Sequence, residues 1–561
     1  MKKNFFSLAA IAAVAVSSVA LYSCDPNEND GGTDQVLLVP VPETSAEASQ
    51  LVNAVYGPLQ TLSSSYSFFL ESATETTVCF EEKDETKDGP QVSILETEPS
   101  NWYAIKIFNR LYSSISAANT AIDRIGKADS EKVSTTALSK ETLIARAQFI
   151  RGYDYFKLVQ YYGEVPLILN YPASDSEKTT RKSVEDVYVQ AAADLEASIA
   201  KLPEYSADKS VPSQLAAKTI LAKLYLTWGQ KPLTQSDVEA IVNSTTDPAK
   251  PAVDNAKLAK AISYANEVIS SNKYRILPNF NNIWGVGNEN NDEVIFSIHH
   301  DGDGLDAQGN HQTHCGYTWP KDERADPHIQ WADILYEKGA NEGGYGLPAS
   351  DERQLYSYAT KVAFQDGNVD TLTWPLSIVR PGKWVHRDGS GTINAVPNQP
   401  NNIDHIDYRL AEVYLIKAEA QWYANNGDKG LAAVNEVRKR AGVDELGTIN
   451  EAAIQQEWLN ELAFEQKHWL NLVRWRTLIS SIKNKVPAYE YYKDVYSNQA
   501  QFNAYSYNGI SADPTRFAFY KRINLHLHKK VANIKGKFYR FPIPLSEKYT
   551  PLGIDGQNPG Y

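Results

Sequence analysis

The feature that most restricts the fold is a pair of helical stretches that are apolar or small on almost every side. Residues 214–228 read QLAAKTILAKLYLTW, and residues 408–423 read YRLAEVYLIKAEAQWY. Each is followed by a second helical pattern, with alanine at positions of close contact: Ala261, Ala265, Ala432 and Ala433. A helix that is apolar all round must be covered on several sides. The pattern therefore predicts helix pairs of the tetratricopeptide type, in which no pair buries its face alone.

Helical spacing of apolar residues also covers much of the rest of the chain. It extends over four further stretches: 45–62, 102–125, 140–162 and 184–202. The third of these is predicted to end at Gly163, because glycine commonly ends a helix and the proline that follows in EVPLIL prevents its restart.

Two regions lack this spacing, at about 275–405 and 481–561. Within the first, Gly, Asn, Asp, Pro and Trp are frequent, and only DEVIFSIHH (292–300) has the pattern of a strand. Loop-rich regions of this length usually carry functional surface. The helical patterns therefore lie at about 43–274 and 406–480, and the chain is long enough for one large domain or several small ones.

The N-terminus reads MKKNFFSLAAIAAVAVSSVALYSC, with two lysines before an apolar run, as in a secretory signal. Its end, Leu21 to Cys24, resembles a bacterial lipobox, which implies cleavage after residue 23 and lipidation of Cys24. The alternative is an ordinary signal peptide with an accidental cysteine. The acidic residues 24–42 are expected to form a flexible tether. No second apolar run approaches membrane-spanning length, so we expect a chain anchored to a membrane without crossing it.

Composition narrows the choice of partner. The formal charge of −13 argues against nucleic acid, whose phosphates require positive charge. The 33 tyrosines and 11 tryptophans suit neutral, hydroxyl-rich ligands or proteins better than anionic ones. Besides Cys24 the chain has two cysteines, Cys79 and Cys315, which are enough for one disulfide. Nothing in the sequence places these two residues together.

The stretch HHDGDGLDAQGNHQTHC invites a metal interpretation. It holds His299, His300, His311, His314 and Cys315. Structural zinc is normally bound by two pairs of ligands, each two to four residues apart, whereas the first two histidines are adjacent and would point to opposite faces of a strand. The DGDGLDAQG segment lacks the EF-hand pattern, with Leu305 at position five and Asp306 at position six. We therefore predict no metal, although a calcium site of another geometry stays open.

No common catalytic motif is present. The chain lacks HExxH, a nucleophile elbow and a phosphate-binding P-loop. A glycosidase needs two carboxylates at a defined separation, and a sequence with 68 acidic residues neither supports nor denies such a pair. We expect a binding protein, not an enzyme.

Several longer segments together resemble the SusD/RagB family of Bacteroidetes surface lipoproteins. They are ARAQFIRGYDYFKLVQYYGEVPLIL (145–169), RLAEVYLIKAEA (409–420), VNEVRKRAGV (434–443), ELAFEQKHWLNLVRW (461–475) and FPIPLSEKYTPLGIDGQNPGY (541–561). The resemblance implies a mostly α-helical, single SusD-like domain over 43–561, with four tetratricopeptide-like helical pairs packed against a loop-rich ligand-binding region. It also implies an outer-membrane lipoprotein, facing the cell exterior, that delivers oligosaccharide to a SusC-like TonB-dependent transporter.

Aromatic side chains in loops are the candidate ligand contacts, because sugar rings pack their C–H faces on aromatic planes. Trp102 precedes the first long helix, at a position that resembles one where family members place a stacking ring beside an Asn, here Asn101. The alternative is that Trp102 packs at the helix start. The loop-rich region adds Trp284, Tyr317, Trp319 and Trp331, and Tyr66 is a more distant candidate. For each of these residues, core packing is the alternative role.

Three rival functions stay open from the sequence. RagB-like members of the family deliver peptides, and such a site would depend on backbone-type hydrogen bonding. A surface glycosidase would release product from a bound oligosaccharide. A purely structural helical scaffold would bind no small ligand.

Overall fold

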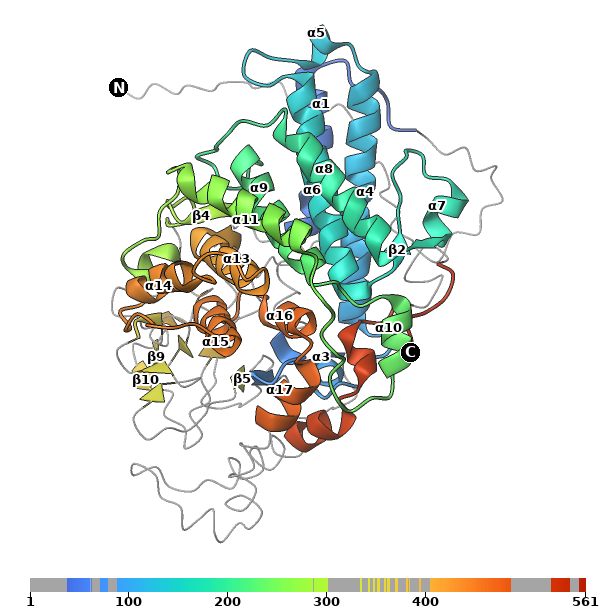
Figure 1. Cartoon of the computed structure of the whole chain (residues 1–561). Coiled ribbons are helices and arrows are strands. Elements are labelled where there is room, and N and C mark those ends of the chain that lie inside the picture. Colours follow the sequence, from blue (N-terminus) through green and yellow to red (C-terminus); the bar gives the residue numbers. More distant parts are fainter. Residues whose placement is uncertain are drawn as a thin grey trace, which may run out of the picture.

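The computed structural model describes residues 38–60, 62, 71–78, 88–285, 287–300, 404–485, 526–544 and 554–561, with short pieces between 333 and 394. Most of these residues are helical (Figure 1). The α-helices are α1 (Ser45–Asn53), α3 (Asp88–Ser93), α4 (Trp102–Lys127), α5 (Ser130–Val133), α6 (Lys140–Tyr162), α7 (Asp175–Thr179), α8 (Val184–Ile199), α9 (Gln214–Gly229), α10 (Gln235–Ile241), α11 (Asn255–Ser270), α13 (Leu410–Tyr423), α14 (Leu431–Arg440), α15 (Glu451–Leu462), α16 (His468–Trp475) and α17 (Leu478–Lys485). Two 3-10 helices are η1 (Phe280–Ile283) and η5 (Gly536–Tyr539).

The long helices pack one on the next in chain order. Helix α4 lies against α6, α6 against α8, α8 against α9, α9 against α11, and α11 against α13, which also contacts α14 and α15 (Figure 1). This succession confirms the mostly helical fold, and it is the arrangement that stacked helix pairs require. The division into four tetratricopeptide-like pairs stays a prediction.

Local sequence explains where these helices begin and end. Thr44 forms a capping box with Glu47 at the start of α1, and Ser139 caps α6 by accepting a hydrogen bond from the backbone N–H of Thr142. Helix α6 ends at Tyr162, followed by Gly163 with φ of 73°, as the sequence predicts.

Small residues set how closely neighbouring helices approach. A Cβ atom at Gly152 of α6 would lie 2.8 Å from the carbonyl oxygen of Ala191 in α8. Ala261 and Ala265 are fully buried on α11, as predicted. Ala432 is exposed, however, so that part of the prediction is wrong: of the two alanines predicted on α14, Ala433 is buried and Ala432 is not.

Strands are short and scattered. They are β1 (Thr77–Val78), β2 (Val165–Pro166), β3 (Arg181–Lys182), β4 (Val294–Ile298), β5 (Asp333–Ile334), β6 (Glu342–Gly343), β7 (Leu347–Pro348), β8 (Tyr358–Ala359), β9 (Lys361–Ala363), β10 (Val369–Thr371), β11 (Arg380–Pro381), β12 (Ile393–Asn394) and β13 (His405–Arg409). The predicted strand in DEVIFSIHH is β4, which pairs antiparallel with β13, so that Ile298 lies opposite His405 and Val294 opposite Arg409. Both strands are buried throughout, which places this pair in the interior.

The second region without helical spacing in the sequence, at about 481–561, is not loop throughout. Residues 526–533 are helical and η5 follows them, so the prediction of a loop-rich C-terminal region is too coarse. In the described part of the chain, no helix has the combination of length and apolar character needed to cross a bilayer.

Candidate ligand-binding site

Trp102 is the first residue of α4, and its side chain is 49% exposed. Its ring meets the Tyr103 ring edge-on at a centroid distance of 5.0 Å, and the Lys106 ammonium lies 4.4 Å from the centroid of the Trp102 ring. About half of the Trp102 surface is in solvent, so the ring is accessible to a ligand. The exposure therefore favours the first of the two roles considered for Trp102, a platform for a ligand.

Asn101 has a different role from the one the resemblance implies. Its side chain is 1% exposed and caps α4, where the amide oxygen accepts hydrogen bonds from the backbone N–H groups of Tyr103 (3.1 Å) and Ala104 (3.4 Å). Its amide nitrogen donates to the carbonyl oxygen of Asp88 at 2.9 Å. Because the Asn101 side chain is buried and its amide is engaged on both sides, it positions Trp102 and does not face a ligand.

Helix α3 completes the support of Trp102. The Asp88 carboxylate, at the start of α3, accepts a hydrogen bond from the backbone N–H of Trp102 at 2.8 Å. Helix α3 also contacts β1, and β1 pairs antiparallel with β5. Strand β5 begins two residues after Trp331 in the sequence. The start of α4 and strand β5, which lies within the loop-rich region, are therefore linked through α3 and β1.

Trp284 is a corrected prediction. Its side chain is only 6% exposed and packs in a small core with Phe280, Ile283, Val294 and Ile406. The ammonium of Lys383 lies 5.1 Å from the centroid of the Trp284 ring. The sequence around it resembles a loop, but the 3-10 turn η1 directs the ring inward, so Trp284 is a packing residue.

The other candidates lie outside the described residues. They are Tyr66, Tyr317, Trp319, Trp331, the lipidation candidate Cys24, the cysteines Cys79 and Cys315, and the segment 301–309 considered for calcium. His299 and His300 are described: Asp404 accepts a hydrogen bond from the His300 backbone N–H and contacts the His299 ring nitrogen, both at 2.9 Å. Within the described residues, no three His, Cys, Asp or Glu side chains converge on a metal position.

A buried ion network ties the loop-rich region to the helical scaffold. We use this name for nine side chains: Asp351, Arg353, Lys383, Arg409, Arg440, Glu293, Glu457, Glu461 and Glu465. Arg409 is its centre and donates to Glu293 at 2.8 Å, to Glu461 at 2.5 Å and to Glu465 at 2.7 Å. Burial alone would raise the pKa of Glu461, but Arg440, Arg409 and Arg353 together hold that pKa below its ordinary value.

Asp351, Arg353 and Lys383 come from the part of the loop-rich region that follows β4. Arg353 donates to Glu457 at 2.5 Å and to Glu461 at 3.2 Å, and Lys383 donates to Glu465 at 2.7 Å. Charged groups removed from water are retained only where each is closely paired, so these contacts fix the positions of both segments. The network thus holds part of the loop-rich region rigidly against α15.

Comparison with known protein families identifies the fold. The model of the SusD family matches residues 260–561, more than half of the chain, and a second family model, described as starch-binding associating with outer membrane, matches residues 41–226. The chain belongs to the SusD family. The resemblance drawn from the sequence motifs is thereby confirmed.

Individual relatives of this SusD-family protein are distant. It is 25% identical over 397 residues to SusD-like protein P2 of Formosa agariphila, a match that covers 65% of this chain and 70% of the relative. It is 26% identical over 396 residues to a SusD-like protein of Bacteroides ovatus, covering 65% and 64%. Among solved structures, a SusD superfamily protein from Parabacteroides distasonis superposes with a TM-score of 0.64 at 19% identity, over 92% of this chain and 99% of that chain. A laminarin binding SusD-like protein superposes with a TM-score of 0.59 at 19% identity, over 93% and 100%.

The family motifs meet in the buried ion network of this SusD-family protein. Arg409 begins one motif, Arg440 belongs to the second, and Glu461 and Glu465 belong to ELAFEQKHWLNLVRW. Sequence reasoning did not identify these residues as a network. The available signal was the occurrence of charged residues inside otherwise apolar helical patterns, which indicates buried charges but does not reveal their partners.

The buried carboxyl of Glu71 predicts an unusual pH dependence. Burial raises the pKa of Glu71 to about 7, although His468 and the hydrogen bond donated by the Gln466 backbone N–H oppose this shift. The folded state therefore holds this proton more tightly than the unfolded state, and its ionisation destabilises the fold increasingly from about pH 4.5 to about pH 7. Glu71→Gln, which keeps the acceptor, is expected to be more stable than the wild type above pH 7, by up to about 3 kcal/mol.

The measurement is urea unfolding of both proteins between pH 5 and pH 8. The stability difference should shrink towards zero as the pH falls to about 5, because Glu71 is then protonated in the folded wild type. A difference that is constant across this range would contradict the raised pKa.

Proposed function

We propose that this SusD-family protein is a non-catalytic, lipid-anchored glycan-binding protein on the outer face of the outer membrane. It captures oligosaccharide and passes it to a SusC-like TonB-dependent transporter. Family membership supports the architecture, and the match to the second family, starch-binding proteins associating with the outer membrane, supports outer-membrane association. Glycan binding is further supported by two structurally similar proteins, the laminarin binding protein and one solved with xylogluco-oligosaccharide (TM-score 0.55, 21% identity, covering 80% of this chain and 85% of that chain).

The half-exposed ring of Trp102 is the observation that carries this proposal. Its position is fixed by the Asn101 cap and by Asp88, so little conformational entropy is lost when a ligand binds. Lys106 lies over the ring, so a sugar would stack on the opposite face. Asp88, Gln91 and Lys106 are partly exposed and offer hydrogen-bonding groups to sugar hydroxyls.

The remaining ring contacts of the proposed site stay predictions. Tyr317, Trp319 and Trp331 are proposed as further stacking rings, and the contacts from α3 through β1 to β5 support placing at least Trp331 near Trp102. Cys24 is proposed as the lipidated residue on the sequence of the N-terminal segment. No cofactor is proposed.

The test is a calorimetric titration of the purified protein with a panel of glycans and a peptide digest. The panel contains laminari-, xylogluco- and malto-oligosaccharides. We expect saturable binding of at least one neutral oligosaccharide, which chromatography afterwards recovers uncleaved. Binding of peptides alone would favour a RagB-like peptide carrier, and recovery of shortened oligosaccharide would show a glycosidase; either outcome contradicts the proposal.

A further inference from the structure

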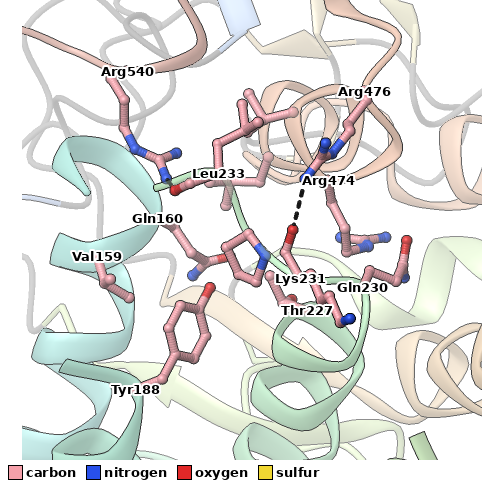
Figure 2. Close-up of a pocket in the computed structure, with 13 residues that line it drawn as sticks. Val159, Gln160, Tyr188, Thr227, Gln230, Lys231, Leu233, Arg474, Arg476 and Arg540 are labelled. Atoms are coloured by element: carbon pink, nitrogen blue, oxygen red, sulfur yellow. Dashed lines mark hydrogen bonds between the residues drawn. The ribbon is translucent and has the colours of Figure 1, made fainter. Parts of the chain in front are cut away.

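A pocket lies at the junction of α6, α8, α9 and α16 (Figure 2). It has about 400 Å³ of empty space, counting its open mouth, and none of its lining residues belongs to α3 or α4. Its walls include three guanidinium groups and one ammonium group, from Arg474, Arg476, Arg540 and Lys231. It carries no carboxylate of its own among the residues that line it.

Arg540 is the most deeply buried of these cations, at 4% exposure. It donates to two backbone carbonyl oxygens, those of Tyr539 (3.1 Å) and Leu233, and forms no ion pair within the described part of the chain. Two carbonyl contacts leave three of the five guanidinium N–H groups for other acceptors. Burial lowers the pKa of Arg540 to about 10, which still leaves the group charged at neutral pH.

Arg476 faces Arg540 across Leu233 in the view of Figure 2. It also donates only to backbone carbonyl oxygens, those of Lys231 (2.9 Å, dashed in the figure) and Ala249. Arg474 differs, because Glu419 pairs with it at 2.7 and 3.0 Å and neutralises it. The two guanidinium groups without a carboxylate partner among the described residues are therefore those of Arg476 and Arg540.

The nearest carboxylates do not satisfy this positive charge. Asp237 and Glu164 act on Arg540 through space, and Asp237 also acts on Arg476, but neither forms an ion pair with these arginines in the described structure. Asp237 instead accepts the backbone N–H of Thr234 at 2.8 Å and so caps α10. The pocket thus keeps a net positive charge.

The hydroxyl of Tyr188 supplies a second, independent observation. Tyr188 lines the pocket, its side chain is 1% exposed, and Figure 2 shows its hydroxyl oxygen pointing towards Gln160. Burial raises the pKa of Tyr188 above its ordinary value, so the hydroxyl keeps its proton and can donate to a bound acceptor.

We propose that this pocket binds a small oxyanion of the size of phosphate or sulfate, held by Arg476, Arg540 and the Tyr188 hydroxyl. Guanidinium groups match the oxygen atoms of such anions, and charge-assisted hydrogen bonds are stronger than those between neutral groups. The anion would balance charges that the described part of the chain leaves uncompensated. A free inorganic ion and the acidic group of a charged sugar both present such an oxyanion. This site does not depend on the proposed glycan function.

The test is calorimetry of the full-length protein with sodium phosphate, sodium sulfate and sodium glucuronate, at constant ionic strength maintained with sodium chloride. We expect saturable binding of at least one of these anions. Arg476→Gln should weaken it at least ten-fold, and Tyr188→Phe about three- to ten-fold, because the latter removes only the hydroxyl. Tighter binding of the inorganic ions would identify a free ion as the ligand, and tighter binding of glucuronate an acidic sugar.

Two matched variants serve as controls. Tyr188 belongs to a stack of rings that continues through Trp228 and Tyr225 to Tyr264, which lies outside the pocket. Tyr264→Phe removes that outer hydroxyl, and Arg275→Gln removes a surface guanidinium that pairs with Asp292. Both should bind the anion as the wild type does. The proposal is overturned if none of the three anions binds saturably, or if binding is the same in Arg476→Gln and Tyr188→Phe as in the controls.

Discussion

Replacing Arg409 by methionine is expected to lower the free energy of unfolding by about 3–5 kcal/mol. The Arg409 side chain is 1% exposed and contacts the carboxylates of Glu293, Glu461 and Glu465. Methionine fills similar volume but carries no charge, so the three carboxylates would lose their common partner while staying buried. The remaining cations of the network cannot move to the vacated position, because each is already held by its own partners. Urea unfolding followed by tryptophan fluorescence measures the loss.

A surface arginine provides the control for this variant. Arg275 pairs with Asp292 at 2.8 Å, but its side chain is 72% exposed, so Arg275→Met should change the free energy of unfolding by less than about 1 kcal/mol. An equal loss of unfolding free energy in the two variants would show that burial does not determine how much Arg409 contributes to stability.

The sequence was sufficient to predict elements that depend on neighbouring residues. The end of α6 at Gly163 and the strand at 294–298 follow from local rules for glycine and for alternation of β-branched and aromatic residues. The buried ion network could not be predicted in this way. Arg409 and Glu461 lie 52 residues apart, and Arg353 and Glu461 lie 108 apart, so only the folded chain shows which charges pair.

The roles of the candidate site residues could not be read from the sequence, for the same physical reason. The composition around Trp284 is typical of a loop, but composition does not report burial, and the ring proves to be in the core. Asn101 was predicted to contact ligand, yet it is a buried helix cap, a role that follows from backbone geometry that the sequence leaves open. The oxyanion pocket joins side chains from segments as distant as Tyr188 and Arg540, and no local pattern relates them.

Replacing Trp102 by alanine is expected to weaken oligosaccharide binding about ten- to a hundred-fold, or roughly 1.4–2.8 kcal/mol. The aromatic plane supplies most of the apolar contact with a sugar ring, and alanine offers none. Because the side chain is 49% exposed, its loss should change the free energy of unfolding by no more than about 0.5 kcal/mol. Trp102→Phe keeps an aromatic plane and should lose less affinity than Trp102→Ala.

The most direct test of the account is a calorimetric comparison of wild-type, Trp102→Ala and Trp102→Phe proteins, titrated with the same oligosaccharide. The oligosaccharide is the one that the wild type binds most tightly in the panel. The account predicts a large loss of affinity in Trp102→Ala, an intermediate loss in Trp102→Phe and unchanged unfolding midpoints in both. Equal affinity of all three proteins for that oligosaccharide would contradict the placement of the glycan site at the start of α4.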